Sequence, residues 1–156
     1  MDVDWDRMKF LVAVDGSEES ENALAYAADI ADAMDGSITI VYAADPTVRD
    51  EGGDEPNVSL WDADRRLTLE SVADVEQRGL DLLEDAADFA AELGQDVEVE
   101  LLYGDPVTEI SDYADEKGFD AIFVGHRGRS ERTDAMVGSV AKSIVERATI
   151  PVTVVR

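Results

Sequence analysis

Short apolar runs alternate with longer segments of helical periodicity along the chain, and this alternation limits the fold more than any other feature. The runs lie at residues 9–14, 37–43, 96–103, 120–124 and 151–155. Most of them are nearly continuous apolar stretches, which are typical of strands buried on both faces of a parallel sheet. Strands that alternate with helices form βαβ units with right-handed crossovers. The sequence therefore predicts an α/β fold, a three-layer sandwich around a five-stranded parallel sheet.

The segments between these runs predict helices with defined ends. Ser17 is a suitable N-cap for the first helix, which Gly36 would close. A long helix is expected from about Leu67 to Leu93. Its inward face is predicted to consist of Val72, Val75, Leu82, Leu83, Ala86, Ala90 and Leu93. Gly104-Asp105-Pro106 predicts a turn, an N-cap and a proline in the first helical position of the next helix.

A polar stretch at residues 45–64, with several prolines, glycines and acids, predicts a variable loop. Trp61 lies in this loop, where it could anchor the loop to the core or a partner subunit, or fold over a ligand. Because the βα pattern resumes afterwards, we expect one domain over residues 1–156, with an acidic tail at 1–7. Residues 96–103 begin with apolar and acidic residues in alternation, which predicts an edge strand. The flavodoxin-like strand order 3-2-1-4-5 is the simplest arrangement.

Glycines follow the fourth apolar run and precede the last helix. Gly125 and Gly128 carry no Cβ, so their backbone amides could approach a ligand closely. Ser139, directly after Gly138, is the expected N-cap of the helix that follows, where open amides and the helix dipole favour an anion. The order strand, glycine loop and helix therefore predicts a phosphate site, although the glycines could equally serve only to make the turn.

The charge of the chain is extreme and unevenly distributed. With 37 acids and 13 bases the net charge is −24, which resembles the surface of a protein from a halophile and excludes nucleic acid as an expected partner. Residues 121–156 differ, because 3 acids and 6 bases give them a net charge of +3. Arg127, Arg129 and Arg132 lie in the glycine loop, where they would bind phosphate or pair with surface carboxylates.

Several classes of site are excluded by composition. The chain has no cysteine and one histidine, so it contains no disulfide framework, thiolate metal site or histidine pair for zinc. No apolar run approaches the ~20 residues of a membrane helix, and the acidic N-terminus lacks the parts of a signal peptide. We therefore expect a cytoplasmic protein without a membrane partner or metal site. His126 is expected to pack or remain exposed, with donation to a phosphate as the alternative.

The expected topology brings two distant segments together. In a sheet of order 3-2-1-4-5, the first and fourth strands are neighbours, and ligands bind in the crevice at their carboxyl ends. Asp15 follows the first strand and Gly125 ends the fourth, so both are expected at this crevice. Asp15 has two possible roles there: it accepts hydrogen bonds from a nucleoside, or it only caps the helix that follows.

The spacing Gly-x2-Gly-x9-Gly-Ser, from Gly125 to Ser139, resembles the nucleotide-binding pattern of the universal stress protein family. The resemblance runs from Lys9 to Arg156 and includes Val-Asp-Gly-Ser-Glu near the start and Pro-Val-Thr-Val-Val at the end. It implies the adenine-nucleotide α-hydrolase-like fold, ATP as ligand with or without Mg²⁺, and a homodimer through the strand at 152–155. The site residues that it implies, together with the crevice, are Ala13, Val14, Asp15, Ala43, Gly125, Arg127, Gly128, Arg129, Gly138, Ser139 and Val140.

The function predicted is therefore nucleotide-dependent regulation, in which ATP occupancy changes the glycine loop and the choice of protein partners, whose identity the sequence does not give. No catalytic residue is predicted, because the chain lacks both the P-loop lysine motif and a Gly-x-Ser-x-Gly nucleophile elbow. Two alternatives stay open. One is an interaction module of the same fold without nucleotide, and the other is slow ATP hydrolysis with Asp15 and magnesium positioning a water.

Overall fold

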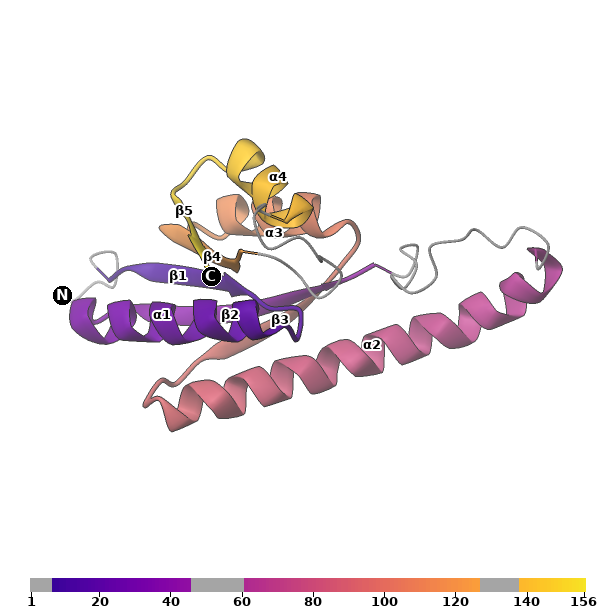
Figure 1. Ribbon diagram of the computed structural model, residues 1–156, viewed down its shortest axis with the longest axis horizontal. Helices are drawn as coiled ribbons and strands as arrows, with labels where there is room; N and C mark the ends of the chain where they lie inside the picture. Colours follow the sequence, from indigo (N-terminus) through magenta and orange to yellow (C-terminus); the bar gives the residue numbers. More distant parts are fainter. Residues whose placement is uncertain (1–6, 46–60, 127–137) are drawn as a thin grey trace.

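The computed structural model describes residues 7–45, 61–126 and 138–156, with the backbone alone for residues 61–71. Strands and helices alternate through this part of the chain (Figure 1). In order they are β1 (Lys9–Ala13), α1 (Glu18–Met34), β2 (Ser37–Ala44), α2 (Trp61–Glu92), β3 (Glu98–Tyr103), α3 (Pro106–Glu116), β4 (Ala121–Gly125), α4 (Ser139–Arg147) and β5 (Val152–Val155). The strands pair in parallel in the order β3-β2-β1-β4-β5, which confirms the predicted sheet.

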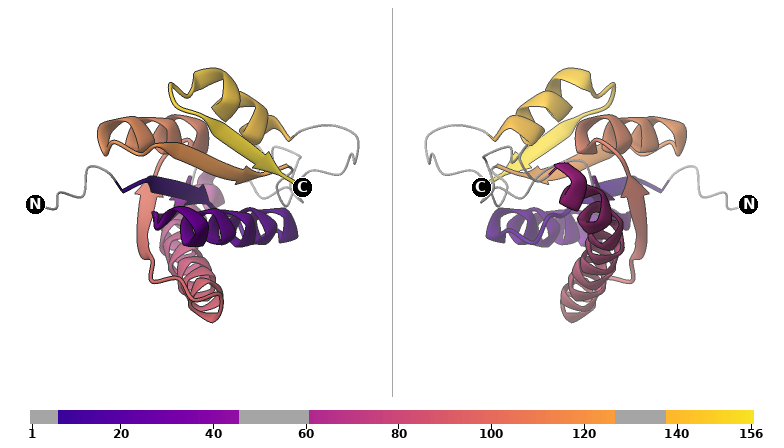
Figure 2. Two further views of the ribbon diagram at one scale, coloured as in Figure 1. Left: turned by 90° about the vertical axis from the view of Figure 1, so that its left-hand side faces the viewer. Right: turned by 90° about the vertical axis from the view of Figure 1, so that its right-hand side faces the viewer.

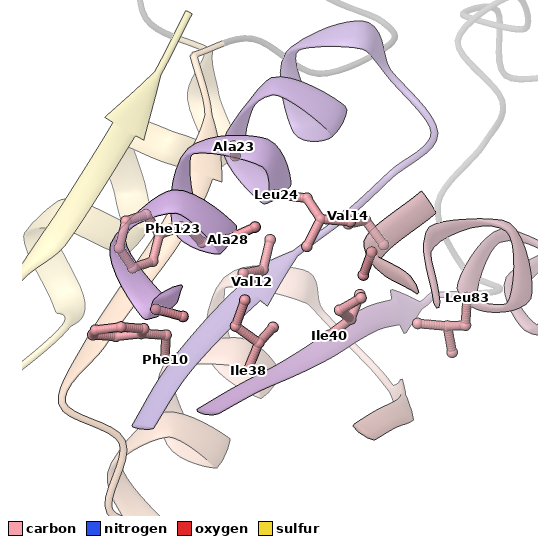
Figure 3. Packing of buried hydrophobic residues seen from close by; sticks show 13 residues of the cluster. Phe10, Val12, Val14, Ala23, Leu24, Ala28, Ile38, Ile40, Leu83 and Phe123 are labelled. Atoms are coloured by element: carbon pink, nitrogen blue, oxygen red, sulfur yellow. The ribbon is translucent and has the colours of Figure 1, made fainter. Parts of the chain in front are cut away.

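The sheet separates two hydrophobic cores. Helices α1 and α2 cover one face, and α3 and α4 cover the other (Figure 2). Successive residues of β1 point to opposite faces, so Phe10 and Val12 pack under α1 while Leu11 packs on the other side. Under α1, the ring of Phe10 meets the edge of Phe123 from β4 with centroids 5.4 Å apart (Figure 3). These residues fix β1 and β4 as the central pair of the sheet.

Helix α1 begins as predicted and ends one residue earlier than predicted. The Ser17 hydroxyl accepts a hydrogen bond from the Ser20 amide at 3.1 Å, as an N-cap does. At the other end, Asp35 and not Gly36 takes the left-handed conformation, with φ 55°. Gly36 is required for another reason, since a Cβ there would lie 2.9 Å from the Phe10 ring.

Helix α2 is longer than predicted, because it starts at Trp61 and not near Leu67. Trp61 therefore belongs to the helix, and the predicted loop boundary at residue 64 is wrong. The acids that follow Trp61 are favourable in the first turn of a helix, so their presence does not indicate a loop. Figure 1 shows that the start of α2 extends beyond the sheet.

The predicted inward face of α2 is correct only in part. Leu83 and Ala90 are buried and contact the core under α1. Val72 and Leu93, which were expected to face inward, are 38% and 42% exposed. Helical periodicity identifies one face of a helix, but not how much of that face meets the sheet. No helix in the described ranges is long and apolar enough to cross a membrane.

The entry to α3 agrees with the prediction. Asp105 is the N-cap, its Oδ2 accepts from the Thr108 amide at 3.0 Å, and Pro106 is the first helical residue. Gly104 has a φ of 128°, which a side chain disfavours, and its amide donates to the Ala44 carbonyl. The predicted edge strand at 96–103 corresponds to β3, which is the terminal strand of the sheet.

Candidate functional site

The carboxyl ends of β1 and β4 meet at the point where the chain winds away in two directions. These strands are neighbours, with Val12 opposite Phe123. From β1 the sheet continues to β2 and β3, and from β4 it continues to β5. Such a reversal leaves a crevice outside the strand ends, because the following connections cross to opposite faces of the sheet. Asp15 and Gly125 therefore reach the same edge of the sheet, as the sequence predicted.

The segment after β1 forms a tight hydrogen-bonded turn into α1. The Asp15 Oδ1 atom accepts from the Ser17 amide at 2.9 Å. Gly16 between them has a φ of 84°, which glycine tolerates best. Ser20 closes the turn, because its hydroxyl donates to the Ser17 carbonyl at 3.0 Å and accepts from the Asp15 amide at 3.3 Å. The turn holds the half-buried Asp15 carboxyl in a defined place at the crevice.

Of the two roles considered for Asp15, the structure shows a local one: its carboxyl binds the amide of Ser17, while Ser17 itself is the N-cap. This bond uses Oδ1 and leaves Oδ2 without a hydrogen-bond partner in the described part of the chain. A carboxylate accepts several hydrogen bonds, so the local bond does not prevent a second one to a ligand. Ser20 was not predicted from the sequence, although a serine three residues after an N-cap serine is a readable signal.

Gly125 has a role that the sequence did not predict. A Cβ at this position would lie 2.8 Å from the backbone carbon of Glu19 and 2.9 Å from the Ser20 amide nitrogen. The absence of a side chain therefore lets the first turn of α1 lie directly against the end of β4. The prediction that Gly125 admits a ligand is not tested by this contact. What the contact explains is how the two sides of the crevice approach each other.

His126 joins three segments at the edge of the crevice. Its amide donates to the carbonyl of Val155 at the end of β5, and its carbonyl accepts from the Gly138 amide at 2.8 Å. The residues before and after the segment 127–137 are thus bonded to each other. The His126 side chain is only 5% exposed, and its Nε2 atom has no hydrogen-bond partner among the described residues. The predicted site residues Arg127, Gly128 and Arg129 lie outside the described residues.

The start of α4 corrects one prediction. Ser139 was expected as the N-cap, but the N-cap is Gly138, and Ser139 is the first helical residue. The bond from the Gly138 amide to His126 holds Gly138 in an extended conformation outside the helix, with φ −63° and ψ 156°. In the described part of the chain no side chain caps α4, and its first turn contains no acid. Its first amides, at the exposed residues Ser139 and Val140, therefore remain suited to bind an anion.

The remaining predicted residues lie at the ends of β1 and β2. Ala13 ends β1 and Ala43 lies one residue before the end of β2, both half-buried on the side of α3 and α4. Val14 is buried under α1, and its amide donates to the Val41 carbonyl at 3.0 Å. Backbone groups alternate in direction along a strand, so those of Ala43 point the same way as those of Val41, past the end of β1. The backbone groups of Ala43 therefore face the crevice.

Within the described ranges, no group of three or more His, Asp or Glu side chains is arranged to hold a metal ion. A groove of about 490 Å³ lies elsewhere, between α2 and β3. We assign the candidate site to the strand ends and not to this groove, because among the described residues the strand ends combine the first amides of α4 with a positioned carboxyl.

A model of the universal stress protein family matches residues 7–156. The chain belongs to the universal stress protein family. This universal stress protein is 34% identical over 148 residues to the universal stress protein YxiE of Bacillus subtilis, and the match covers 95% of this chain and 98% of the relative. The resemblance inferred from the glycine pattern is confirmed.

Two solved structures of similar proteins contain adenine nucleotides. One is a universal stress protein from Archaeoglobus fulgidus in complex with dAMP, with a TM-score of 0.64, 25% identity and coverage of 97% of this chain and 99% of that one. The other is a universal stress protein in complex with cAMP, with a TM-score of 0.64, 25% identity and 96% coverage of both chains. Nucleotide binding is therefore found among the structural neighbours of this universal stress protein.

Proposed function

We propose that this protein binds an adenine nucleotide, with ATP as its ligand, and regulates partner proteins according to its occupancy. The observation that carries this proposal is the N-terminus of α4, which no side chain of the described residues caps and which the His126–Gly138 bond holds beside the end of β4. An open helix N-terminus attracts a phosphate through its free amides and its dipole. The dAMP and cAMP complexes of the two similar proteins support the choice of an adenine nucleotide.

The nucleoside would lie across the ends of β1 and β2. The Asp15 carboxyl has an oxygen available for a ribose hydroxyl, and the backbone groups of Ala43 face the place where the base would lie. Phosphates would then extend toward α4, with Mg²⁺ or the predicted arginines Arg127 and Arg129 neutralising their charge. The order of these groups matches the order base, sugar and phosphate of a nucleotide.

Regulation would act through the segment 127–137, whose flanking residues His126 and Gly138 bind each other. A phosphate on the α4 amides would lie beside Gly138, so occupancy would act on the residue that follows this segment and thereby on partner binding. We also propose a homodimer through β5, since it is a terminal strand with an open edge in the described sheet. A monomeric mass in sedimentation equilibrium would exclude the dimer.

The test is calorimetric titration of ATP, with Mg²⁺, into protein stripped of copurified nucleotide, using wild type and Asp15→Asn. Asparagine keeps an oxygen for the Ser17 amide and removes the charge, so it separates the local bond from ligand contact. Loss of a hydrogen bond from a charged acceptor costs about 1.5–3 kcal/mol, so we expect the affinity to fall about tenfold or more.

Asp120→Asn is the matched control, because Asp120 Oδ2 also accepts from a backbone amide, that of Lys9 at 2.8 Å, but lies at the amino ends of β1 and β4, at the edge of the sheet opposite to the crevice. It should leave ATP affinity unchanged. Absence of binding by wild type would reject the proposal and favour an interaction module without nucleotide. Release of inorganic phosphate from ATP in the same samples would instead indicate slow hydrolysis.

A further inference from the structure

A groove lies between α2 and the edge strand β3. β3 and β5 form the two opposite edges of the sheet. Its volume is about 490 Å³. Apolar side chains from both elements form its floor and walls. They are Leu80, Leu83 and Ala87 of α2 and Val99, Leu101 and Tyr103 of β3. The groove lies beside β3, at one edge of the sheet, whereas the proposed nucleotide site lies at the carboxyl ends of β1 and β4.

Close contact between α2 and the sheet fixes the shape of the groove. A Cβ at Gly79 would lie 2.8 Å from the Tyr42 ring and 2.9 Å from the Leu101 side chain, so α2 approaches the sheet directly at this glycine. Leu83, one turn later, is buried. Leu80 and Val99 remain 45% and 43% exposed, although both are large and apolar. The groove is thus formed by a close helix–strand contact that leaves Leu80, Val99 and Tyr103 accessible.

The polar residues of the groove are acidic. Glu76, Glu84 and Glu100 line it, and no lysine or arginine lines it among the residues whose side chains the structure describes. The Tyr103 hydroxyl donates to Glu76 Oε2 at 2.7 Å, which orients that carboxylate beside the apolar surface. The same hydrogen bond raises the pKa of Tyr103 above its ordinary value.

We propose that this groove docks a basic, amphipathic segment of a partner protein, with apolar residues on Leu80 and Val99 and lysine or arginine on the glutamates. Charge complementarity selects this occupant. A second copy of this chain docked through the same groove is disfavoured, because it would bring Glu76, Glu84 and Glu100 against the same glutamates of the other copy. The backbone of β3 has no strand partner on its outer edge in the described sheet, so an extended segment can also pair with it.

This inference goes beyond the nucleotide site and does not depend on it. Its test uses a labelled peptide that alternates leucine with lysine, so that an extended chain presents one apolar and one basic face. Fluorescence anisotropy measures its affinity for the nucleotide-free protein. A second peptide, with serine in place of each leucine, has the same charge and should bind at least about tenfold more weakly if apolar contact matters.

Two variants test the two parts of the groove. We expect Glu76→Gln/Glu84→Gln/Glu100→Gln to weaken binding of the leucine–lysine peptide about tenfold, since each exposed ion pair contributes modestly. Leu80→Ser/Val99→Ser should produce a loss of about the same size through apolar contact. Both sets change exposed side chains, so the far-ultraviolet circular dichroism spectrum should remain unchanged.

Matched controls carry the same changes on other surfaces. Asp29→Asn/Glu116→Gln/Glu146→Gln removes as much charge from exposed positions elsewhere, and Met34→Ser/Val145→Ser removes exposed apolar side chains. Both controls should bind the peptide as wild type does. Equal losses in the acidic control would show that binding follows net charge alone and would overturn the proposal. So would no binding by wild type, or a dimer that dissociates in the groove variants.

Discussion

Helices α1 and α4 both begin at the same crevice, yet their N-termini are satisfied in opposite ways. At α1, Ser17 caps the helix, Asp15 binds the Ser17 amide, and Glu18, Glu19 and Glu21 supply negative charge in the first turn. At α4, the N-cap is Gly138, with no side-chain bond and no acid in the first turn. A helix end that the chain neutralises itself has little need of an anion. The comparison therefore indicates which terminus is open for a phosphate.

The largest effect is expected where the two termini are held together. In Gly125→Val, the added side chain would collide with the Glu19 backbone, so α1 must move away from β4. Overpacking of this kind lowers the free energy of unfolding by about 1–3 kcal/mol. We expect urea denaturation to show a decrease in the upper part of that range. ATP binding should also be lost.

Gly94→Ala serves as the control for removing a glycine. Gly94 has a φ of 83°, but no atom lies within 4 Å of the place of its Cβ. Gly94→Ala should lower the free energy of unfolding by about 1 kcal/mol, from backbone strain alone. Its nucleotide affinity should be unchanged. If Gly125→Val were no worse than this control, the contact between α1 and β4 would not hold the crevice together.

The next effect comes from making α4 resemble α1. Gly138→Asp would place a capping carboxylate at the open terminus, where the extended backbone accepts it. The carboxylate would compete with a phosphate for the same amides, so we expect ATP affinity to fall about tenfold while the helix gains a few tenths of a kcal/mol. Calorimetry and thermal denaturation measure the two changes. Val145→Asp adds the same charge to the other half of α4 and should leave affinity close to that of wild type.

The smallest effect comes from making α1 resemble α4. Ser17→Ala removes the side-chain cap and should destabilise the protein by about 1 kcal/mol, measured by urea denaturation. Because Asp15 still binds the amide at position 17, the crevice should keep its shape and ATP affinity should change less than twofold. A larger loss of affinity would show that the α1 terminus, too, takes part in ligand binding.

The sequence predicted the features that local chemistry decides. The strand order followed from alternating runs and the rules of βαβ connection, and the caps at Ser17 and Asp105 followed from residue type and position. It failed where long-range contacts override local preference. Ser139 is a better N-cap than glycine by residue type, but the bond between Gly138 and His126 sets the start of α4 one residue earlier.

Other features of the site depend on distances between elements, which no local pattern contains. The contact of Gly125 with Glu19 links residues far apart in the sequence and becomes visible only once α1 lies on β4. The groove beside β3 likewise depends on how closely Gly79 brings α2 to the sheet. Periodicity marked Val72 as inward, yet it is 38% exposed, and among the described side chains of α2 the buried apolar ones are Leu83 and Ala90.

The bond from the His126 amide to the Val155 carbonyl has a thermodynamic consequence. Val155 ends β5, the strand that is proposed to pair two copies, and His126 flanks the proposed phosphate site. Any event that displaces one of these residues acts on the other through a shared backbone bond. Linkage between two binding equilibria is reciprocal. If nucleotide strengthens the pairing of two copies by some factor, pairing must strengthen nucleotide affinity by the same factor.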